Sequence, residues 1–260
     1  MKHAKSKPYI IMIKKSFKEQ MEYQVDFYLR CLYEISIVAV NLIFFDVIYY
    51  QIGAIGNWSL EEIKILVLVA ALLDGVITFF FVEGLNRLPG MISTGEIEYL
   101  LLRPINKRIY ISFYKVCASQ IISISIFALY TIVLMIKSGF TFMQLFVFGF
   151  MFIVAAFILY CLFFCIMCLS FWTIRVDIGV SLFFQLFNMG NKPMEVYPVV
   201  VRKILSFVVP IGLAINYPVI SLTSYFTVRH LVEEVVVAVF MFFVSHYILK
   251  KGLERYESIG

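Results

Sequence analysis

The chain has 260 residues, of which 62% are hydrophobic and only 15% are charged, and its mean hydropathy is +0.92. A single soluble core of this length could not bury so much apolar surface, which excludes a soluble globular domain. The net charge of +5 comes from basic residues at both ends of the chain and near residues 87–108. This distribution is typical of membrane topology and not of nucleic-acid binding.

The apolar residues fall into blocks near the length of roughly 20 residues with which a helix crosses the hydrocarbon core. No strand-like alternation is evident, so we predict an all-α, polytopic membrane protein with six transmembrane helices. Residues 1–30 would form an N-terminal amphipathic helix, and residues 31–260 the transmembrane domain. The five cysteines are scattered in apolar surroundings, and a disulfide framework is not expected.

The N-terminal segment, residues 1–30, carries seven Lys or Arg but no apolar core followed by a small-residue cleavage site. It is therefore not expected to be a removable signal peptide. Within residues 9–29, apolar side chains recur at intervals of three and four, and most charged side chains lie off that stripe. This spacing predicts an amphipathic helix at the membrane surface. A solvated helix that packs on a partner is the alternative.

Three spans are predicted in the first half of the chain, at about residues 31–52, 60–83 and 109–136. The link at residues 52–58 has glycines for a turn and no Lys or Arg, so it should lie outside the cell. The link after the second span is basic and should lie inside, since it carries Arg87, Arg103, Lys107 and Arg108.

The second half begins with 37 uncharged positions between Lys137 and Arg175, about 55 Å if they were helical throughout. That length exceeds the thickness of about 30 Å that an upright helix crosses. The fourth helix must therefore tilt, protrude or begin after a turn near Thr141. The final span is predicted at about residues 231–250.

Between these spans, Pro210 and Pro218 each remove a backbone donor from another uncharged run. We predict a broken, re-entrant element at about residues 197–228, because irregular backbone at membrane depth must lie against protein or water. Both ends of the chain are basic, which places both in the cytoplasm and requires an even number of crossings. The fifth span is either residues 176–190 or residues 204–226, and the sequence leaves both open.

Signals of catalytic chemistry are weak. In some soluble enzymes cysteines with the spacing of Cys161, Cys165 and Cys168 hold an iron–sulfur cluster. Here they lie inside the longest uncharged run, so we expect them to be small residues that pack against neighbouring helices. The three histidines are far apart, and no phosphate-binding loop of the form GxxxxGK[ST] occurs. We therefore predict no catalytic residue, no metal and no cofactor in this chain.

Asp74 lies near the middle of the second span, where a carboxylate is costly and normally faces a bundle interior or a water-filled path. Two roles of Asp74 stay open: it lies on a path or an interface, or its carboxyl hydrogen-bonds a neighbouring helix and serves packing. Glu34 and Asp46 lie nearer the ends of the first span, where structural roles suffice.

The segment GEIEYLLLRPINKR, residues 95–108, is charged and amphipathic between two apolar runs. On a helix that starts near Gly95, Glu96 and Glu98 occupy the first turn, and Arg103 lies at its end, which complements the helix dipole. Pro104 favours termination. One side of this helix is apolar, with Ile97, Leu100 and Leu101. Such a helix can present itself to a partner at the membrane surface, and a passive anchor would look the same.

Three segments resemble the type-2 permease family of ATP-binding-cassette (ABC) exporters. GEIEYLLLRPI is similar to the family's cytoplasmic loop after the second span, and residues 197–218, YPVVVRKILSFVVPIGLAINYP, are similar to its late Pro-rich segment. The ending GLERYESIG, residues 252–260, resembles its C-terminal pattern. The likeness covers most of the chain in order and in spacing.

The resemblance implies a permease subunit of the bacterial plasma membrane that exports an amphiphilic or hydrophobic cargo such as a peptide, a drug or a lipid-like molecule. Its partners would be membrane lipids, two copies of a cytoplasmic ATPase that bind ATP and Mg²⁺, and a second permease, identical or homologous. Residues 91–104 would form the coupling helix that receives force from the ATPase. The cargo's identity and the choice between homodimer and heterodimer stay open.

The resemblance also implies roles for individual residues. ATPase contact and helix termination would fall to Gly95, Glu96, Glu98, Arg103 and Pro104. The translocation path, on the first, second and fifth spans, would include Asn41, Asp74 and Thr78. The outer gate would include Pro210, Asn216 and Pro218.

An ion-gradient-driven secondary transporter or channel is the alternative function. It predicts several ionisable residues within the membrane and often a repeat between the two halves of the chain. The sequence shows one deep acid and no clear repeat. A lipid-modifying enzyme would need a cluster of His, Asp or Glu at one membrane face, which the sequence lacks.

Overall fold

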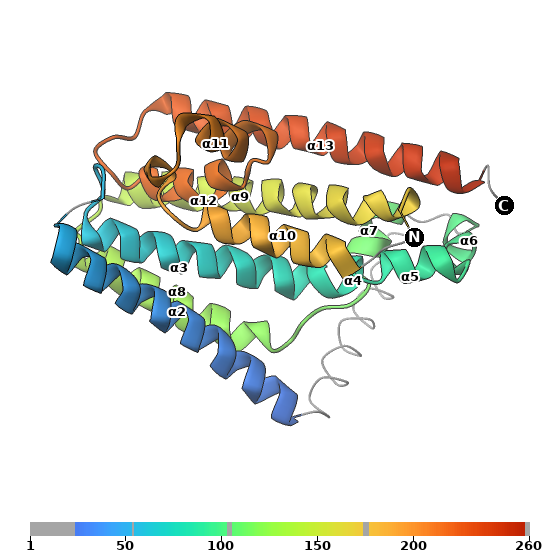
Figure 1. Ribbon diagram of the computed structural model, residues 1–260, viewed down its shortest axis with the longest axis horizontal. Helices are drawn as coiled ribbons and strands as arrows, with labels where there is room; N and C mark the ends of the chain where they lie inside the picture. Colours follow the sequence, from blue (N-terminus) through green and yellow to red (C-terminus); the bar gives the residue numbers. More distant parts are fainter. Residues whose placement is uncertain (1–23, 54, 103–105, 174–176, 258–260) are drawn as a thin grey trace.

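The computed structural model describes residues 24–53, 55–102, 106–173 and 177–257. These residues form helices and no strand, apart from an isolated bridge between Ile55 and Trp58. Long helices run side by side along one axis (Figure 1). The predicted all-α, polytopic fold is confirmed.

Within the described residues, five stretches are long and apolar enough to cross a membrane, or six if one bent helix pair counts as a span. The second stretch continues from its α-helix through a π-helical turn, Thr78–Val82, to Ser93. The helices that carry the five stretches are α2 (Gln24–Ile52), α3 (Leu60–Ile77), α8 (Gln120–Lys137), α9 (Phe142–Cys168) and α13 (Val228–Glu257).

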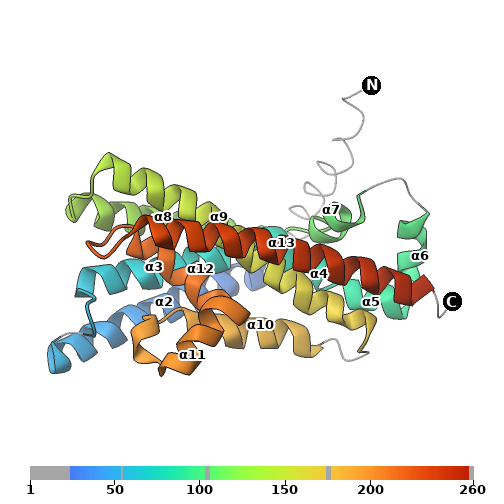
Figure 2. The same cartoon turned by 90° about the horizontal axis from the view of Figure 1, so that it is seen from above.

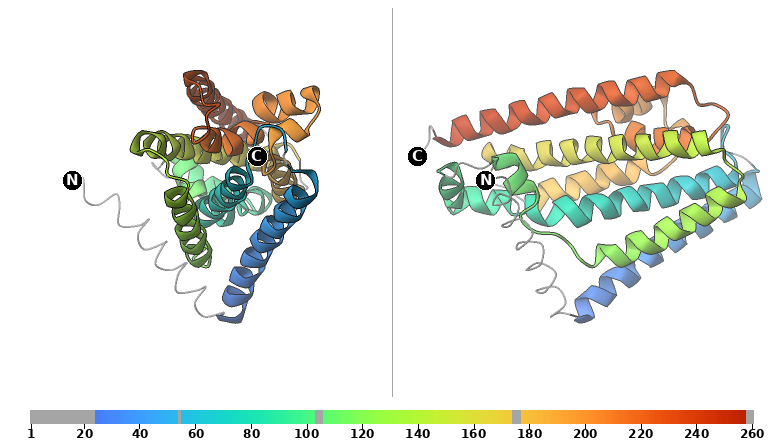
Figure 3. Two further views of the ribbon diagram at one scale, coloured as in Figure 1. Left: turned by 90° about the vertical axis from the view of Figure 1, so that its left-hand side faces the viewer. Right: turned by 180° about the vertical axis from the view of Figure 1, so that it is seen from behind.

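The bundle has two distinct ends (Figures 1 and 3). The end that we call the α6 end carries the last residues of α13 and four short helices: α4 (Glu83–Leu85), α5 (Leu88–Ser93), α6 (Glu96–Leu101) and α7 (Lys107–Ser112). The opposite end, which we call the turn end, carries the connections from α2 to α3, from α8 to α9 and into α13. Short helices thus gather at one end, and chain reversals at the other.

Local sequence signals set several of these helix starts. Ser59 and Glu62 form a reciprocal capping box at the start of α3, and Thr141 and Gln144 form another at the start of α9. The cap at Thr141 follows a turn at Gly139, which has a positive φ of 69°. The fourth span therefore begins after a turn near Thr141, as one of the predicted solutions required.

The predicted start of the third span, residue 109, is wrong. Residues 107–112 form the separate helix α7, which the Asn106 side chain caps by accepting from the Ile109 N–H at 3.2 Å. The membrane-crossing helix α8 begins only at Gln120. Between them the Cys117 N–H donates to the Phe79 carbonyl of the π-helical turn at 3.0 Å. This bond across the bundle holds the intervening chain out of the helix.

The N-terminal prediction falls partly outside the described residues, since residues 1–23 are not among them. From Gln24 onward one continuous helix, α2, runs into the first span with no break near residue 30. Much of its length is exposed and apolar, as expected for contact with lipid or with another membrane protein.

The predicted break at Pro210 is present. Helix α11 (Val199–Lys203), a π-helical turn and α12 (Ile211–Ile220) form a pair bent by 93°. Pro218, by contrast, lies inside α12 without ending it, so the break of this element falls at Pro210 alone. Both arms of the pair lie in the half of the bundle nearer the turn end (Figures 1 and 2).

Helix α10 (Asp177–Gly190) lies alongside α3 and α9 and runs antiparallel to them, away from the α6 end and toward this bent pair (Figure 1). It has 14 residues, fewer than a full crossing needs. Because α10 leads the chain away from the α6 end and the bent pair stays near the turn end, the arrangement favours residues 176–190 as the fifth crossing over residues 204–226.

The core forms around α3 and α9. Helix α3 packs on α2, α8, α9 and α12, and in the end-on view it lies between α2 and α8 (Figure 3). Helix α9 packs on α12 and α13. The largest fully buried side chains come mainly from these central helices and include Ile63, Leu66, Leu73, Phe163 and Phe164.

A close approach between α4 and α7 generates a stability prediction. A Cβ on Gly84 would lie 2.7 Å from the Ser112 carbonyl oxygen and 2.8 Å from that of Ile111, both of them backbone atoms that cannot step aside. Gly84→Ala should therefore lower the free energy of unfolding by about 1–3 kcal/mol. The measurement is unfolding in mixed micelles by titration with a denaturing detergent.

The matched control is Gly149→Ala in α9, where an added Cβ meets nothing within 4 Å. This substitution should raise stability by about 0.5–1 kcal/mol, because alanine favours a helix interior. Equal stability of the two variants would contradict the packing of α4 on α7.

Candidate functional site

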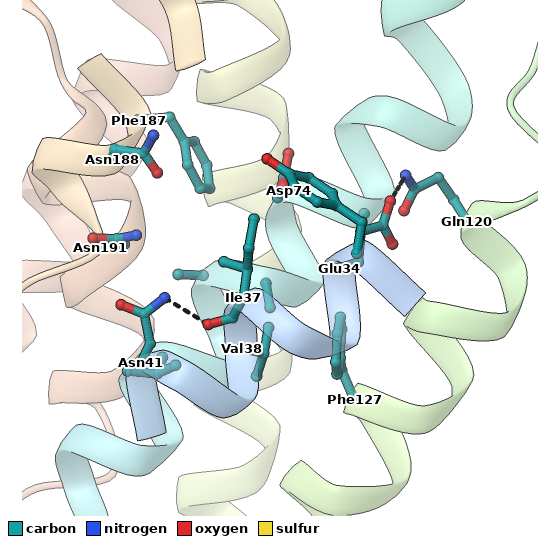
Figure 4. Close-up of a pocket in the computed structure, with 15 residues that line it drawn as sticks. Glu34, Ile37, Val38, Asn41, Asp74, Gln120, Phe127, Phe187, Asn188 and Asn191 are labelled. Carbon is teal, nitrogen blue, oxygen red and sulfur yellow. Dashed lines mark hydrogen bonds between the residues drawn. The ribbon is translucent and has the colours of Figure 1, made fainter. Parts of the chain in front are cut away.

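A polar cavity of about 100 Å³ lies between α2, α3, α8 and α10 (Figure 4). Its polar side chains come from all four helices: Glu34 and Asn41 from α2, Asp74 from α3, Gln120 from α8, and Asn188 with Asn191 at the end of α10. Apolar side chains, among them Ile37, Val38 and Phe187, complete the lining. Figure 4 shows Asn188 and Asn191 projecting from α10 toward the helices opposite.

The acids on this cavity are held by neutral groups. The Gln120 amide donates to the Glu34 carboxylate, and the Thr78 hydroxyl donates to Asp74 at 3.4 Å. No Lys or Arg is among the lining residues in the described part of the chain. A carboxylate at membrane depth is costly without a cation or water, so these carboxyl groups must reach one of them or take up a proton.

The structure brings together two of the three residues predicted for the path. Asn41 and Asp74 both line the cavity, and Thr78 lies one turn beyond Asp74 and reaches it only through the hydrogen bond. Four further residues line the cavity that were not predicted for the path: Glu34, for which a structural role was expected, and Gln120, Asn188 and Asn191. A signal for α10 was available, because Ser181, Gln185 and Asn188 recur with helical spacing in an apolar segment.

None of the residues predicted for the outer gate lines this cavity. Asn216 is buried, donates to the Gly190 carbonyl at 3.0 Å and accepts from the Met194 N–H at 3.3 Å. It therefore ties α12 to the end of α10. Pro210 and Pro218 lie on the same bent pair, at its break and within its second arm.

At the α6 end, α5 and α6 meet at Gly95, whose φ of 75° is in the left-handed region that favours glycine. This turn sets α6 across the end of the bundle (Figure 1). Ile97 and Leu100 are buried beneath it, while the side chain of Leu101 lies outside the described part. The helix ends at Leu101 with Leu102 as its C-cap, and Arg103 and Pro104, which were predicted for its end, lie outside the described residues.

The two acids of α6 bind partners in the same chain. Arg87 donates to both carboxylate oxygens of Glu96, at 2.9 and 3.1 Å, and its guanidinium lies 4.3 Å from the centre of the Tyr114 ring. The Tyr256 hydroxyl, near the end of α13, donates to Glu98 at 3.2 Å. Both carboxylates therefore fix α6 to the bundle.

Two large apolar side chains are exposed at α6, beside the exposed Glu98. Tyr99 and Leu102 are 71% and 83% exposed, although both lie beyond the membrane-crossing helices. Tyr99 also borders a hollow of about 190 Å³ with Met91, Glu96, Leu100 and Tyr110. Exposed apolar side chains beside a hollow are typical of a surface that binds another protein. The sequence analysis missed both residues, because the buried face of α6 was not known.

Comparison with known proteins identifies the family to which this chain belongs. A sequence profile of the family described as "ABC-2 family transporter protein" matches residues 35–260, which is most of the chain. This chain is a member of the ABC-2 transporter family. No curated protein matches it. The family assigns it to the membrane permeases of ABC transporters, and the resemblance found in the sequence is confirmed.

In this ABC-2 permease the next helix, α7, is anchored by Arg108. Its guanidinium lies 5.1, 4.8 and 5.1 Å from the ring centres of Tyr160, Phe164 and Phe242, so it contacts α9 and α13 together. Burial lowers the pKa of Arg108. The hydrogen bond that Arg108 donates to the Tyr160 hydroxyl, 3.0 Å long, raises this pKa, and the net result lies above the ordinary value. The guanidinium stays charged and joins α7 to the bundle.

Water access to the cavity of the ABC-2 permease can be tested with a thiol reagent that reacts only in water. All five native cysteines are buried, which lowers the background. Asn188→Cys should react roughly tenfold or more faster than Leu182→Cys, because a lipid-facing thiol does not ionise. Leu182 is exposed on the same helix but does not line the cavity. Equal rates would contradict a water-filled cavity.

The role of Glu96 can be tested by a double-mutant cycle with Arg87→Gln and Glu96→Gln. Because both side chains are partly exposed, their ion pair should show a coupling free energy of about 0.5–1 kcal/mol in detergent unfolding. A coupling near zero would mean that Glu96 does not hold α6 to the bundle.

Proposed function

We propose that this chain is the permease subunit of an ABC exporter and moves an amphiphilic or hydrophobic cargo with energy from a separate ATPase. The observation that carries the proposal is the construction of α6. This helix is fixed to the bundle through Glu96 and Glu98 while Tyr99 and Leu102 point away from it. A rigid helix with two exposed apolar side chains suits a role in receiving force from another protein.

The energy must come from a partner, because the sequence has no phosphate-binding loop. In our proposal two copies of a cytoplasmic ABC ATPase bind ATP and Mg²⁺ and dock on α6 of two permeases. Gly95 sets the angle of this coupling helix, Glu96 and Glu98 hold it, and Tyr99 and Leu102 contact the ATPase. Arg103 and Pro104 stay predictions for its end.

Force applied to α6 has a direct route to the opposite end of the molecule. Tyr256 links α6 to the end of α13, and Arg108 links α7 to the middle of α13 through Phe242. At the start of α13, Glu233 accepts a hydrogen bond of 2.8 Å from Tyr217 of α12. Movement of α6 would thus displace α13 as a rigid body and shift the bent pair that carries Pro210, Asn216 and Pro218, our proposed outer gate.

The cavity between α2, α3 and α10 supports the proposed path. Asn41, Asp74 and Glu34 offer polar contacts beside apolar side chains, which suits an amphiphilic cargo. The exposed faces of α2 and α10 flank the cavity and suit a second permease, identical or homologous, that would complete its wall.

The proposed orientation places the α6 end in the cytoplasm of a bacterial cell, with the chain in the plasma membrane. The positive-inside rule supports this orientation through the basic residues of the links around α6 and α7 and of the last turns of α13, while Lys137, Arg202, Lys203 and Arg229 lie toward the turn end. The basic residues at the α6 end include Arg87, Lys107, Arg108, Lys115, Lys250, Lys251 and Arg255. Both ends of the chain would then be cytoplasmic.

One observation favours the alternative of an ion-gradient-driven transporter more than the sequence did. Glu34 joins Asp74 on the same cavity, and Glu234 of α13 is buried with no hydrogen-bond partner among the described residues. The sequence analysis counted only one deep acid. Transport by the purified chain without ATP, driven by an ion gradient, would establish this alternative.

The proposal predicts that Tyr99→Ala with Leu102→Ala weakens association with the partner ATPase. Loss of two exposed apolar contacts at the centre of an interface should raise the dissociation constant roughly tenfold or more. The measurement is co-purification with candidate ATPases, followed by titration of the one that associates.

The matched control is Tyr50→Ala, since Tyr50 is 92% exposed but lies near the turn end. It should leave the association unchanged. If no ABC ATPase associates with the wild-type chain, or if the α6 variant binds it as tightly as the control, the proposed docking role of α6 is wrong.

A further inference from the structure

The charge of the polar cavity is one-sided. Apart from the phenol of Tyr33, the ionisable side chains that line it are Glu34 and Asp74, and both are acids. The other polar lining residues are amides, and in the described part of the chain no Lys, Arg or His reaches the cavity wall. The described parts of these helices carry three basic residues, Arg30, Lys64 and Lys137, and none of them lines the cavity. Lys64 forms an ion pair with Asp46 at 2.7 Å.

The hydrogen bonds of the two acids do not neutralise them. Glu34 accepts from the amide of Gln120, which is itself buried, and Asp74 accepts from the hydroxyl of Thr78. Neutral donors orient a carboxylate but carry no full charge to offset its own. In surroundings of low polarity, that charge attracts a cation strongly and repels an anion.

The size of the cavity limits what enters it. A volume of about 100 Å³ has room for a head group of a few heavy atoms and not for a complete amphiphile. Ile37 lines the cavity and is also exposed on the outer face of α2. An apolar chain attached to the head group could therefore leave the cavity along this face of α2, beside Val40 and Phe44, which are exposed as well.

We propose that this cavity selects cationic amphiphiles: molecules with an amine or quaternary ammonium head group on an apolar chain. The inference rests on the proposed function and deepens it, because it narrows the cargo from any amphiphile to one of positive charge. Glu34 and Asp74 supply the opposite charge, while Asn41, Asn188 and Asn191 accept hydrogen bonds from an amine. Anionic amphiphiles are rejected by the same carboxylates.

The test is equilibrium binding to the full chain in nanodiscs of neutral lipid, without ATP. The probe is radiolabelled dodecyltrimethylammonium, and the competitors are dodecyl sulfate and dodecyl maltoside, which share its chain length. The wild-type protein should bind the cation saturably, and dodecyl sulfate should fail to displace it. Asp74→Asn should raise the dissociation constant about tenfold, and Glu34→Gln should do the same.

The matched control is Glu61→Gln, which neutralises an exposed acid of α3 that lies outside the cavity. Its dissociation constant should equal that of the wild type. The two cavity variants are compared only if they elute as the wild type does in size-exclusion chromatography. If one cavity variant does not fold, the inference is judged on the dissociation constant of the other variant and on the competition between cation and anion in the wild type.

Saturable binding of dodecyl sulfate with an affinity equal to that of the cation would overturn the inference, as would an unchanged dissociation constant in a folded cavity variant. Either result leaves the proposed permease function intact, because binding is measured without ATP or ATPase. Failure of the chain to associate with any ABC ATPase would count against the function and not against the charge selectivity.

Discussion

A polar group inside the hydrocarbon must find its partner within the protein, and this constraint organises the molecule. Most of the chain satisfies it with unbroken helices. The exceptions are the bent pair at Pro210 and the non-helical segment before α8, and each is tied to a neighbouring element. Asn216 bonds the bent pair to the end of α10, and Cys117 bonds the other segment to the Phe79 carbonyl. Irregular backbone therefore occurs where protein surrounds it.

The same constraint gives meaning to the two places where polar groups lack an obvious structural purpose. Acids and amides from four helices line the cavity, and no basic side chain is among the described lining residues. Acids in such a position cost stability, so a purely structural role does not explain them. Helix α6 lies beyond the bundle, held by Glu96 and Glu98, and exposes Tyr99 and Leu102 where burial would be expected. The proposed export function accounts for both features.

Local signals allowed part of this structure to be predicted from the sequence. The starts of α9 and α6 follow from a cap at Thr141 and a glycine at residue 95, and membrane-length apolar runs gave most of the spans. The start of α8 was predicted wrongly because it depends on a bond to Phe79 across the bundle. Glu34 and Asp74 line the same cavity because of the register between α2 and α3. The spacing of residues within one helix carries no information about that register.

The most direct test of the account is whether ATP changes the side from which the cavity is reached. Asn191→Cys, with the partner ATPase in proteoliposomes, would be labelled by an impermeant thiol reagent from each side, with and without ATP and vanadate. We expect reaction from the α6 side without nucleotide and a shift of at least tenfold toward the turn end when ATP is trapped. Identical labelling from both sides in both conditions would contradict a permease driven through α6.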